Sequence, residues 1–140
     1  MERRRVPRDL ALKVLFQVDV GHLPLDEVLS LAYEEVPSTP QDREFVEETV
    51  RGVLAEQTEL DRIIDDLAEG WRVERLANVD KNVLRLALWE LRHHPDLPKG
   101  LVIEHAVELA RKYSTDESPR FVNGILGAYV RRRQDAAPSA

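Results

Sequence analysis

The sequence predicts an all-α protein. Apolar residues recur at intervals of three and four positions in nearly every segment, which is the spacing of an amphipathic helix. No segment alternates apolar and polar residues for long enough to suggest a strand. With 140 residues and 43% apolar content, the chain can bury one real core, so we expect residues 1–140 to form a single domain.

The first two helices are predicted from turn residues and short apolar faces. The first helix should open near Pro7, because proline is favourable in a first helical turn, and it should stop before Gly21. Its inward face carries Leu12, Leu15 and Phe16. A short second helix is expected over about residues 25–36.

A long third helical segment follows a turn at residues 37–40. Thr39 can cap it, because a threonine hydroxyl accepts a hydrogen bond from a free backbone N–H of the first turn. Its predicted buried stripe consists of Phe45, Val46, Val50, Val53, Leu54, Leu60, Ile63, Ile64 and Leu67. Gly70 should end the segment, and a connector containing Trp71 follows.

The next two helices have the clearest apolar stripes. One runs from about residue 80 to residue 93, with Asp80 in its first turn. Its inward residues are Val83, Leu84, Ala87, Leu88 and Leu91. The other ends near Tyr113. Its inward residues are Val102, Ile103, Ala106, Val107 and Ala110.

The last helix is predicted from a capping signal. Ser118 is expected as the N-cap and Pro119 as the first helical residue. The inward residues are Val122, Ile125, Leu126 and Tyr129. Residues 134–140 are expected to form a disordered tail.

The charges of the chain are unevenly distributed. The net charge is −6, which by itself opposes binding to phosphate-rich partners. Arginines nevertheless cluster at both ends, at Arg3, Arg4, Arg5 and Arg8 and again at Arg131, Arg132 and Arg133. If the ends meet, they form one basic patch on an acidic body, whereas the alternative is a pair of solvated tails that bind nothing.

Neither export nor membrane insertion is expected. No stretch approaches the roughly 18 to 20 uninterrupted apolar residues of a membrane span, and no apolar signal-peptide core follows the N-terminus. A cytoplasmic location is therefore predicted. The chain contains no cysteine, which excludes disulfides, thiolate catalysis and sulfur-ligated metal sites.

A search for catalytic and metal-binding groups leads to a prediction of no enzyme activity, no metal and no cofactor. The side chains of His93 and His94 diverge on a helix and cannot share one metal ion. Asp65 and Asp66 diverge in the same way and are interpreted as a solvated face. The scattered glycines match no phosphate-binding loop.

The last helix carries features that allow two interpretations. Gly124 and Gly127 lie inside it, where glycine is tolerated if another helix packs closely or a ligand approaches. Phe121 follows Arg120 in the first turn, so this pair could stack a base and hold a phosphate. The alternative for Phe121 is a peripheral place in the core.

Four segments together resemble the NusB family of bacterial transcription antitermination factors. Residues 3–17 resemble its arginine-rich first helix, and residues 79–91 and 118–126 match two more specific motifs. Residues 102–110 are similar to its penultimate helix. The resemblance covers nearly the whole chain, in order and with similar spacing.

The resemblance implies both a fold and a function. The fold would consist of two small packed helical bundles with about six to seven helices. The protein would have no catalytic activity and would bind the single-stranded boxA element of nascent ribosomal RNA. It would do so together with the small-subunit ribosomal protein that acts as NusE, in an antitermination complex with RNA polymerase.

The resemblance also assigns roles to individual residues. The RNA-binding positions would be Arg3, Arg4, Arg5 and Arg8 in a basic arm at residues 1–8, and Arg120 and Phe121 at the last helix. The positions that look towards the protein partner would be Phe16 and Asp80, although capping is an equal alternative for Asp80. Many family members have a tyrosine at the position of Phe16, so this chain lacks the hydroxyl group that a tyrosine would offer there. The family's Ile-Asn-Glu-Ala is replaced here by residues 103–106, Ile-Glu-His-Ala.

Two alternative functions remain open at this point. A NusB-like domain also occurs at the N-terminus of some RNA cytosine methyltransferases, but a chain that ends at Ala140 is expected to have no room for a catalytic domain. The second alternative is a helical scaffold that binds only proteins through its acidic surface. A scaffold should show no salt-dependent RNA binding.

Overall fold

The computed structural model of the protein describes residues 5–136, with side chains described for residues 7–134. Within the described range all regular elements are helices, so the prediction of an all-α fold is confirmed there. The chain divides into two compact units, residues 1–57 and residues 58–140.

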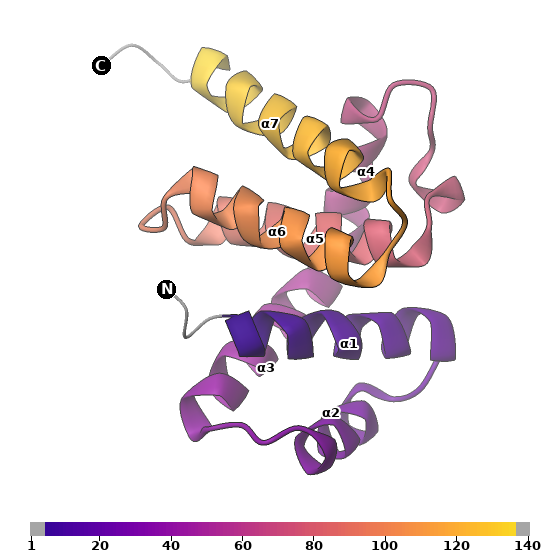
Figure 1. Ribbon diagram of the computed structural model, residues 1–140, viewed down its shortest axis with the longest axis vertical. Coiled ribbons are helices and arrows are strands. Elements are labelled where there is room, and N and C mark those ends of the chain that lie inside the picture. Colours follow the sequence, from indigo (N-terminus) through magenta and orange to yellow (C-terminus); the bar gives the residue numbers. More distant parts are fainter. Residues whose placement is uncertain (1–4, 137–140) are drawn as a thin grey trace. The chain divides into compact units, whose positions relative to one another are not determined.

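Unit 1 contains three helices. Helix α1 (Arg5–Gly21) packs against both α2 (Leu25–Glu35) and α3 (Pro40–Ala55), as Figure 1 shows. The bounds of these helices lie within about two residues of those predicted from the sequence, except that α3 ends earlier. The fully or almost fully buried apolar residues described in this unit are Leu10, Ala11, Leu12, Val14, Leu15, Val28, Leu29, Val46, Val50 and Val53.

Side-chain hydrogen bonds define the start of α3. The Thr39 hydroxyl accepts a hydrogen bond from the Asp42 N–H at 3.0 Å, and the Asp42 carboxylate accepts one from the Thr39 N–H at 3.1 Å. This reciprocal pair is a capping box, and it confirms the predicted cap. Arg51 of α3 then binds Asp26 of α2 at 2.9 Å.

The predicted long third segment is in fact two helices. Helix α3 ends at Ala55, and Glu56 leaves the helical conformation with φ −108° and ψ 14°. The apolar stripe is interrupted between Leu54 and Leu60, so the two halves bury separate faces rather than one continuous face. Gly70 has φ +80°, which glycine adopts at little cost, and it lies in the turn after the second half.

Unit 2 contains the remaining helices. They are α4 (Gln57–Leu67), a short 3-10 helix η2 (Val73–Arg75), α5 (Asn78–His93), α6 (Lys99–Tyr113) and α7 (Ser118–Ala136). Helices α5, α6 and α7 pack against one another (Figure 1). This arrangement forms a helical bundle with α5 as its most buried member.

The structure corrects three expectations about unit 2. Every residue from Asn82 to Leu91 is buried, whereas one inward face was predicted for α5. Ser118 is the first residue of α7, not its N-cap, because the Phe121 N–H donates to the Glu117 carbonyl. Helix α7 continues to Ala136, so residues 134–136 of the predicted disordered tail are helical, and residues 137–140 lie outside the described range.

Candidate nucleic-acid interface

The basic arm predicted at the N-terminus is only partly described. Arg3 and Arg4, and the side chain of Arg5, lie outside the described residues. Arg8 is 2% exposed, and its guanidinium carbon lies 5.7 Å from the centroid of the Phe45 ring, in a cation–π arrangement. Arg8 is therefore buried against Phe45 of the same unit, and its role in RNA binding stays a prediction.

Asp80 is a structural junction in unit 2. It lies in the first turn of α5 and is 8% exposed. One carboxylate oxygen accepts a hydrogen bond from the Ser114 hydroxyl at 2.7 Å, and the other accepts one from the Ser118 hydroxyl at 3.0 Å. The carboxylate is therefore buried within unit 2, and a role for Asp80 towards a protein partner stays a prediction. The carboxylate ties α5 to the connection between α6 and α7.

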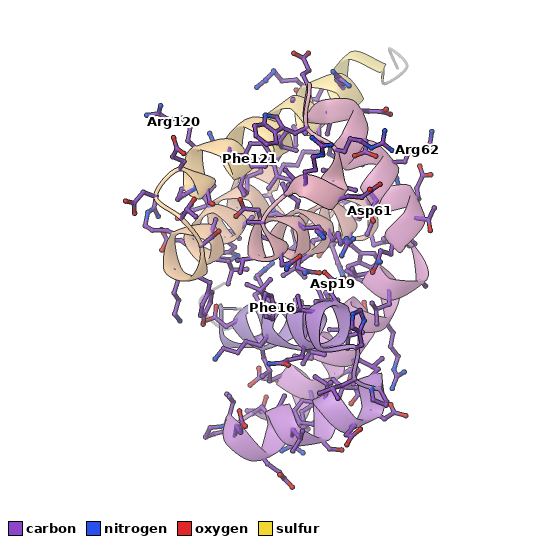
Figure 2. The ribbon with its side chains drawn as sticks, turned by 90° about the vertical axis from the view of Figure 1, so that its right-hand side faces the viewer. Phe16, Asp19, Asp61, Arg62, Arg120 and Phe121 are labelled. Atoms are coloured by element: carbon purple, nitrogen blue, oxygen red, sulfur yellow. The ribbon has the colours of Figure 1, made fainter. Side chains whose placement is uncertain are left out.

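Phe16 lies on α1 and is half-buried (Figure 2). Val20, one helical turn further along, is 41% exposed. The two side chains share one side of α1 because residues four apart lie on the same helix face. Together they leave apolar surface exposed at the end of α1, and a role for Phe16 towards a protein partner stays a prediction.

Arg120 and Phe121 are consecutive residues in the first turns of α7 but differ in exposure. Arg120 is exposed and points away from the helix, as Figure 2 shows. Phe121 is half-buried, which is compatible with both a stacking surface and a peripheral core position. The two residues are neighbours in the sequence, but their side chains diverge on the helix, and the RNA-binding role of each stays a prediction.

A polar cavity of about 530 Å³ lies between the end of α6 and the start of α7, with Arg120 in its wall. Arg111, Thr115, Asp116, Pro119, Arg120 and Asn123 contribute to its walls. Our sequence reasoning missed Arg111 and Asn123. In the sequence, Arg111 is marked only by its place near the end of a helix, because its proximity to Arg120 depends on how α6 and α7 pack.

The structure does not support tight helix packing as the reason for the two glycines of α7. A Cβ atom at Gly124 would have no atom within 4 Å, and one at Gly127 would meet only the end of the flexible Arg131 side chain at 3.2 Å. The interpretation of close contact with another helix is therefore wrong at both positions. At Gly124 the backbone of α7 is instead open.

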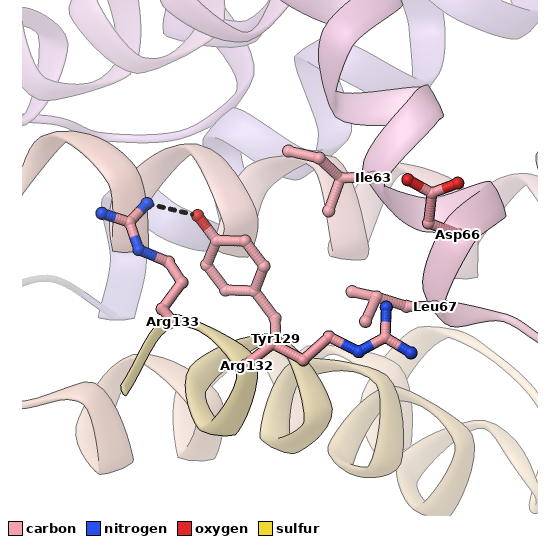
Figure 3. A pocket seen from close by; sticks show the side chains of 6 residues that line it. All are labelled: Ile63, Asp66, Leu67, Tyr129, Arg132 and Arg133. Carbon is pink, nitrogen blue, oxygen red and sulfur yellow. Dashed lines mark hydrogen bonds between the residues drawn. The ribbon is translucent and has the colours of Figure 1, made fainter. Parts of the chain in front are cut away.

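A second, smaller cavity of about 200 Å³ lies between α4 and α7 (Figure 3). Ile63 and Leu67 of α4 form one wall, and Arg133 donates a hydrogen bond to the Tyr129 hydroxyl at 2.7 Å on the other. Two arginines of the C-terminal cluster, Arg132 and Arg133, therefore contact their own unit. A joint basic patch with the N-terminal arginines stays a prediction.

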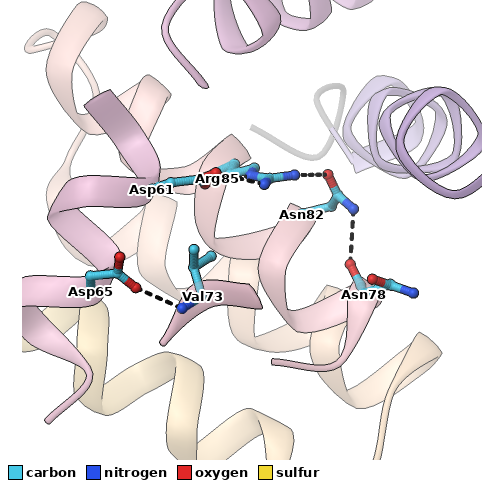
Figure 4. A network of polar contacts seen from close by, with 6 residues as sticks. All are labelled: Asp61, Asp65, Val73, Asn78, Asn82 and Arg85. Carbon is cyan, nitrogen blue, oxygen red and sulfur yellow. Dashed lines mark hydrogen bonds and ion pairs between the residues drawn. The ribbon is translucent and has the colours of Figure 1, made fainter. Parts of the chain in front are cut away.

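Two aspartates of α4, Asp61 and Asp65, have structural roles within unit 2. The Asp65 carboxylate accepts a hydrogen bond from the Val73 N–H at 2.6 Å, which fixes the start of η2. Asp61 binds Arg85 through two hydrogen bonds of 2.7 and 2.8 Å, and Arg85 also donates to Asn82 at 3.3 Å (Figure 4). These contacts link α4 to η2 and α5 and hold unit 2 together.

Two further observations concern residues 5–136. No group of three or more histidine, cysteine, aspartate or glutamate side chains in this range is placed to hold a metal ion. No helix in the same range is long and apolar enough to cross a membrane.

Over residues 5–136, these features define an all-helical protein with an exposed, arginine-lined cavity on unit 2. The model of the NusB family matches residues 5–131 of the chain. The chain therefore belongs to the NusB family.

Individual relatives agree over nearly the whole length. The transcription antitermination protein NusB of Desulforudis audaxviator is 42% identical over 138 residues, which is 99% of each chain. The structure of NusB from T. maritima has a TM-score of 0.85 at 34% identity and covers 96% of this chain and 93% of its own. A structure of NusB and NusE in complex with dsRNA also has a TM-score of 0.85, at 28% identity, and covers 94% of this chain and 98% of its own.

Proposed function

We propose that this chain is a non-catalytic transcription antitermination factor. It binds single-stranded, boxA-like RNA in nascent ribosomal transcripts together with the ribosomal protein NusE, in a complex with RNA polymerase in the cytoplasm. The observation that carries the proposal is the agreement with NusB relatives over almost the entire chain. The similar structure of NusB and NusE in complex with dsRNA supports NusE and RNA as partners, and the single-stranded form of the RNA is part of the proposal.

The proposed RNA contacts come from two segments. Arg3, Arg4 and Arg5 supply cations to the phosphates, and Arg120 with Phe121 supplies a cation and a stacking surface. Arg8 is buried against Phe45, so its part is to hold the first turn of α1. Asp80 holds the connection that precedes Arg120 and Phe121.

The charge of the chain explains why a partner is needed. A net charge of −6 repels RNA at long range, so the isolated chain should bind weakly at physiological salt. A basic ribosomal protein would neutralise this repulsion, and RNA that touches both proteins would gain effective concentration. Phe16 and the exposed Val20 provide apolar surface on which such a partner could dock.

The test is a titration of labelled boxA-like RNA, and of a scrambled RNA of equal length, into the chain with and without NusE. We expect tighter binding of the boxA-like RNA, and a further gain when NusE is present. Replacement of Arg4 and Arg5 by alanine should flatten the plot of log K against log salt by roughly 0.7 for each phosphate group that the variant no longer neutralises. Equal affinity for both RNAs, with no effect of NusE, would contradict the proposal.

A protein-only scaffold is the second candidate, because unit 1 exposes many carboxylates. Those on α2 and α3 include Asp26, Glu27, Glu34, Glu35, Glu44 and Glu48. The same titrations separate the two functions. A scaffold should bind NusE but leave the RNA affinity low and insensitive to salt.

A further inference from the structure

The cavity between α6 and α7 has the composition of a phosphate-binding site. Two guanidinium groups line it, Arg111 from α6 and Arg120 from α7, together with the Asp116 carboxylate, and Arg111 also pairs with the carboxylate of Glu108. Both arginine side chains are accessible to solvent. Guanidinium groups bind phosphate oxygens through paired N–H donors, so two of them on neighbouring helices suit one phosphodiester group.

The rigidity of the connection between these helices favours a preformed site. The Ser118 hydroxyl bonds to Asp80, and it lies 2.9 Å from both the Ser114 hydroxyl and the Thr115 hydroxyl. These bonds fix the residues that join α6 to α7. Arg111 is oriented further by an ion pair with Glu108, one turn before it on α6. A site whose walls are held in place loses less entropy when a ligand binds.

The cavity also contains a polar side chain that is suited to contact a base, Asn123. Asn123 lies one turn after Arg120 on α7, and its exposed amide offers both donors and an acceptor. The volume of about 530 Å³ is much larger than a phosphate ion and falls within the range of sites for ligands the size of a nucleotide.

We propose that this cavity holds one nucleotide of the bound single-stranded RNA, with Arg111 and Arg120 at its phosphate and Asn123 at the edge of its base. This inference rests on the proposed function and adds Arg111 and Asn123 to the RNA-binding residues.

The test uses the full chain with NusE and the labelled boxA-like RNA, with binding measured by fluorescence anisotropy over a range of salt. Arg111→Gln should weaken binding roughly tenfold, the effect of one charge-assisted contact, and lower the salt slope by about 0.7. Lys112→Gln is the matched control, because it removes one charge from the same helix at a residue that does not line the cavity. It should change affinity by less than about twofold, because screening weakens an indirect effect of charge.

Two further variants test the chemistry of the site. Asp116→Asn removes the carboxylate from the cavity lining and should tighten binding of both RNAs. Asn123→Ala should reduce the difference in affinity between boxA-like and scrambled RNA and leave the salt slope unchanged, because it removes a base contact and not a phosphate contact. Thermal unfolding of each variant shows whether the fold is retained.

The outcomes distinguish this inference from the proposed function. If the wild type binds RNA with NusE but Arg111→Gln behaves as Lys112→Gln does, the inference is wrong and the proposed function stands. If the wild type does not bind RNA, both are wrong. The cavity could instead serve a free nucleotide. In that case Arg111→Gln binds AMP more weakly than the wild type does, whereas the two proteins bind RNA equally well. That result also overturns the inference.

Discussion

The Asp80 carboxylate accepts a hydrogen bond from the Ser118 hydroxyl at 3.0 Å, which connects the first turn of α5 to the first turn of α7. These residues are 38 positions apart in the sequence. Since α7 carries Arg120 and Phe121 in the same region, this bond positions the proposed RNA-binding segment without contacting RNA. Both carboxylate oxygens of Asp80 already accept hydrogen bonds from serine hydroxyls of unit 2. A partner protein would have to displace Ser114 and Ser118 to bind this carboxylate.

The first prediction concerns this junction. Asp80→Ala should lower the free energy of unfolding by roughly 1.5–3 kcal/mol, because it removes a buried charged acceptor and leaves the Ser114 and Ser118 hydroxyls without it. Urea unfolding measures the decrease, and the exposed Glu104→Ala on α6 is the control. If Asp80→Ala left stability intact but abolished NusE binding, the carboxylate would be a partner contact after all.

The second prediction concerns the ion pair between Asp61 and Arg85. The Arg85 side chain is 5% exposed, so Asp61→Ala should destabilise the protein by about 3–5 kcal/mol by leaving a buried cation without its carboxylate. The combined change with Arg85→Leu should recover most of that stability, since both charges are then absent. Glu59→Ala, which removes an exposed pair with Arg62 on the same helix, should leave stability nearly unchanged. Equal effects of Asp61→Ala and Glu59→Ala would contradict this account.

The third prediction concerns pH. Burial and the neighbouring Glu47 carboxylate raise the pKa of Tyr33 from 10.0 to about 12. A raised pKa in the folded state means that folding favours the neutral phenol, so this contribution to stability is complete below about pH 10 and is lost as the pH rises towards 12. The ultraviolet absorbance of phenolate should therefore show a late step that is absent in Tyr33→Phe. Glu47→Gln should move that step to lower pH, and a step that does not move would exclude Glu47 as a cause.

The fourth prediction separates the two roles of Phe121. If its ring stacks on a base, Phe121→Ala should weaken RNA binding by about 1–3 kcal/mol with little effect on stability. If the ring belongs to the core, the same change should cost about 3–5 kcal/mol of unfolding free energy. We expect the first result, because the side chain is only half-buried.

Phe121→Leu is the matched variant for this test. It keeps most of the apolar volume but removes the aromatic face, so it should retain stability and lower the RNA affinity if stacking is the role. Normal RNA affinity in Phe121→Leu would show that apolar volume is sufficient and would exclude stacking.

The fifth prediction concerns Gly124. Gly124→Ala should stabilise the protein by about 0.5–1 kcal/mol, because the position is helical and a Cβ there meets no atom within 4 Å. Gly70→Ala is the contrasting control and should destabilise, because Gly70 has φ +80°. Thermal or urea unfolding measures both changes. Destabilisation by Gly124→Ala would mean that something packs closely on α7 at this point.

The sequence by itself was sufficient for the helical fold and most helix boundaries. Helical periodicity, the cap at Thr39, the glycine turns and the proline at the start of α7 depend on residues within one or two turns of each other, so they can be recognised along the chain. Family membership could be inferred from the motif at residues 118–126, because its order and spacing are properties of the sequence.

The tertiary structure decided how the polar side chains are used. Arg8, Asp80 and Arg85 look like exposed charges in the sequence, yet each is buried against partners on another helix. The end of helix α3 at Ala55 and the burial of α5 on all sides also depend on how the helices pack, which the sequence does not show. The physical reason is that the cost of burying a charge is offset only by a partner brought close in space. The same holds for the cavity at Arg111 and Arg120, which exists because α6 and α7 pack against each other.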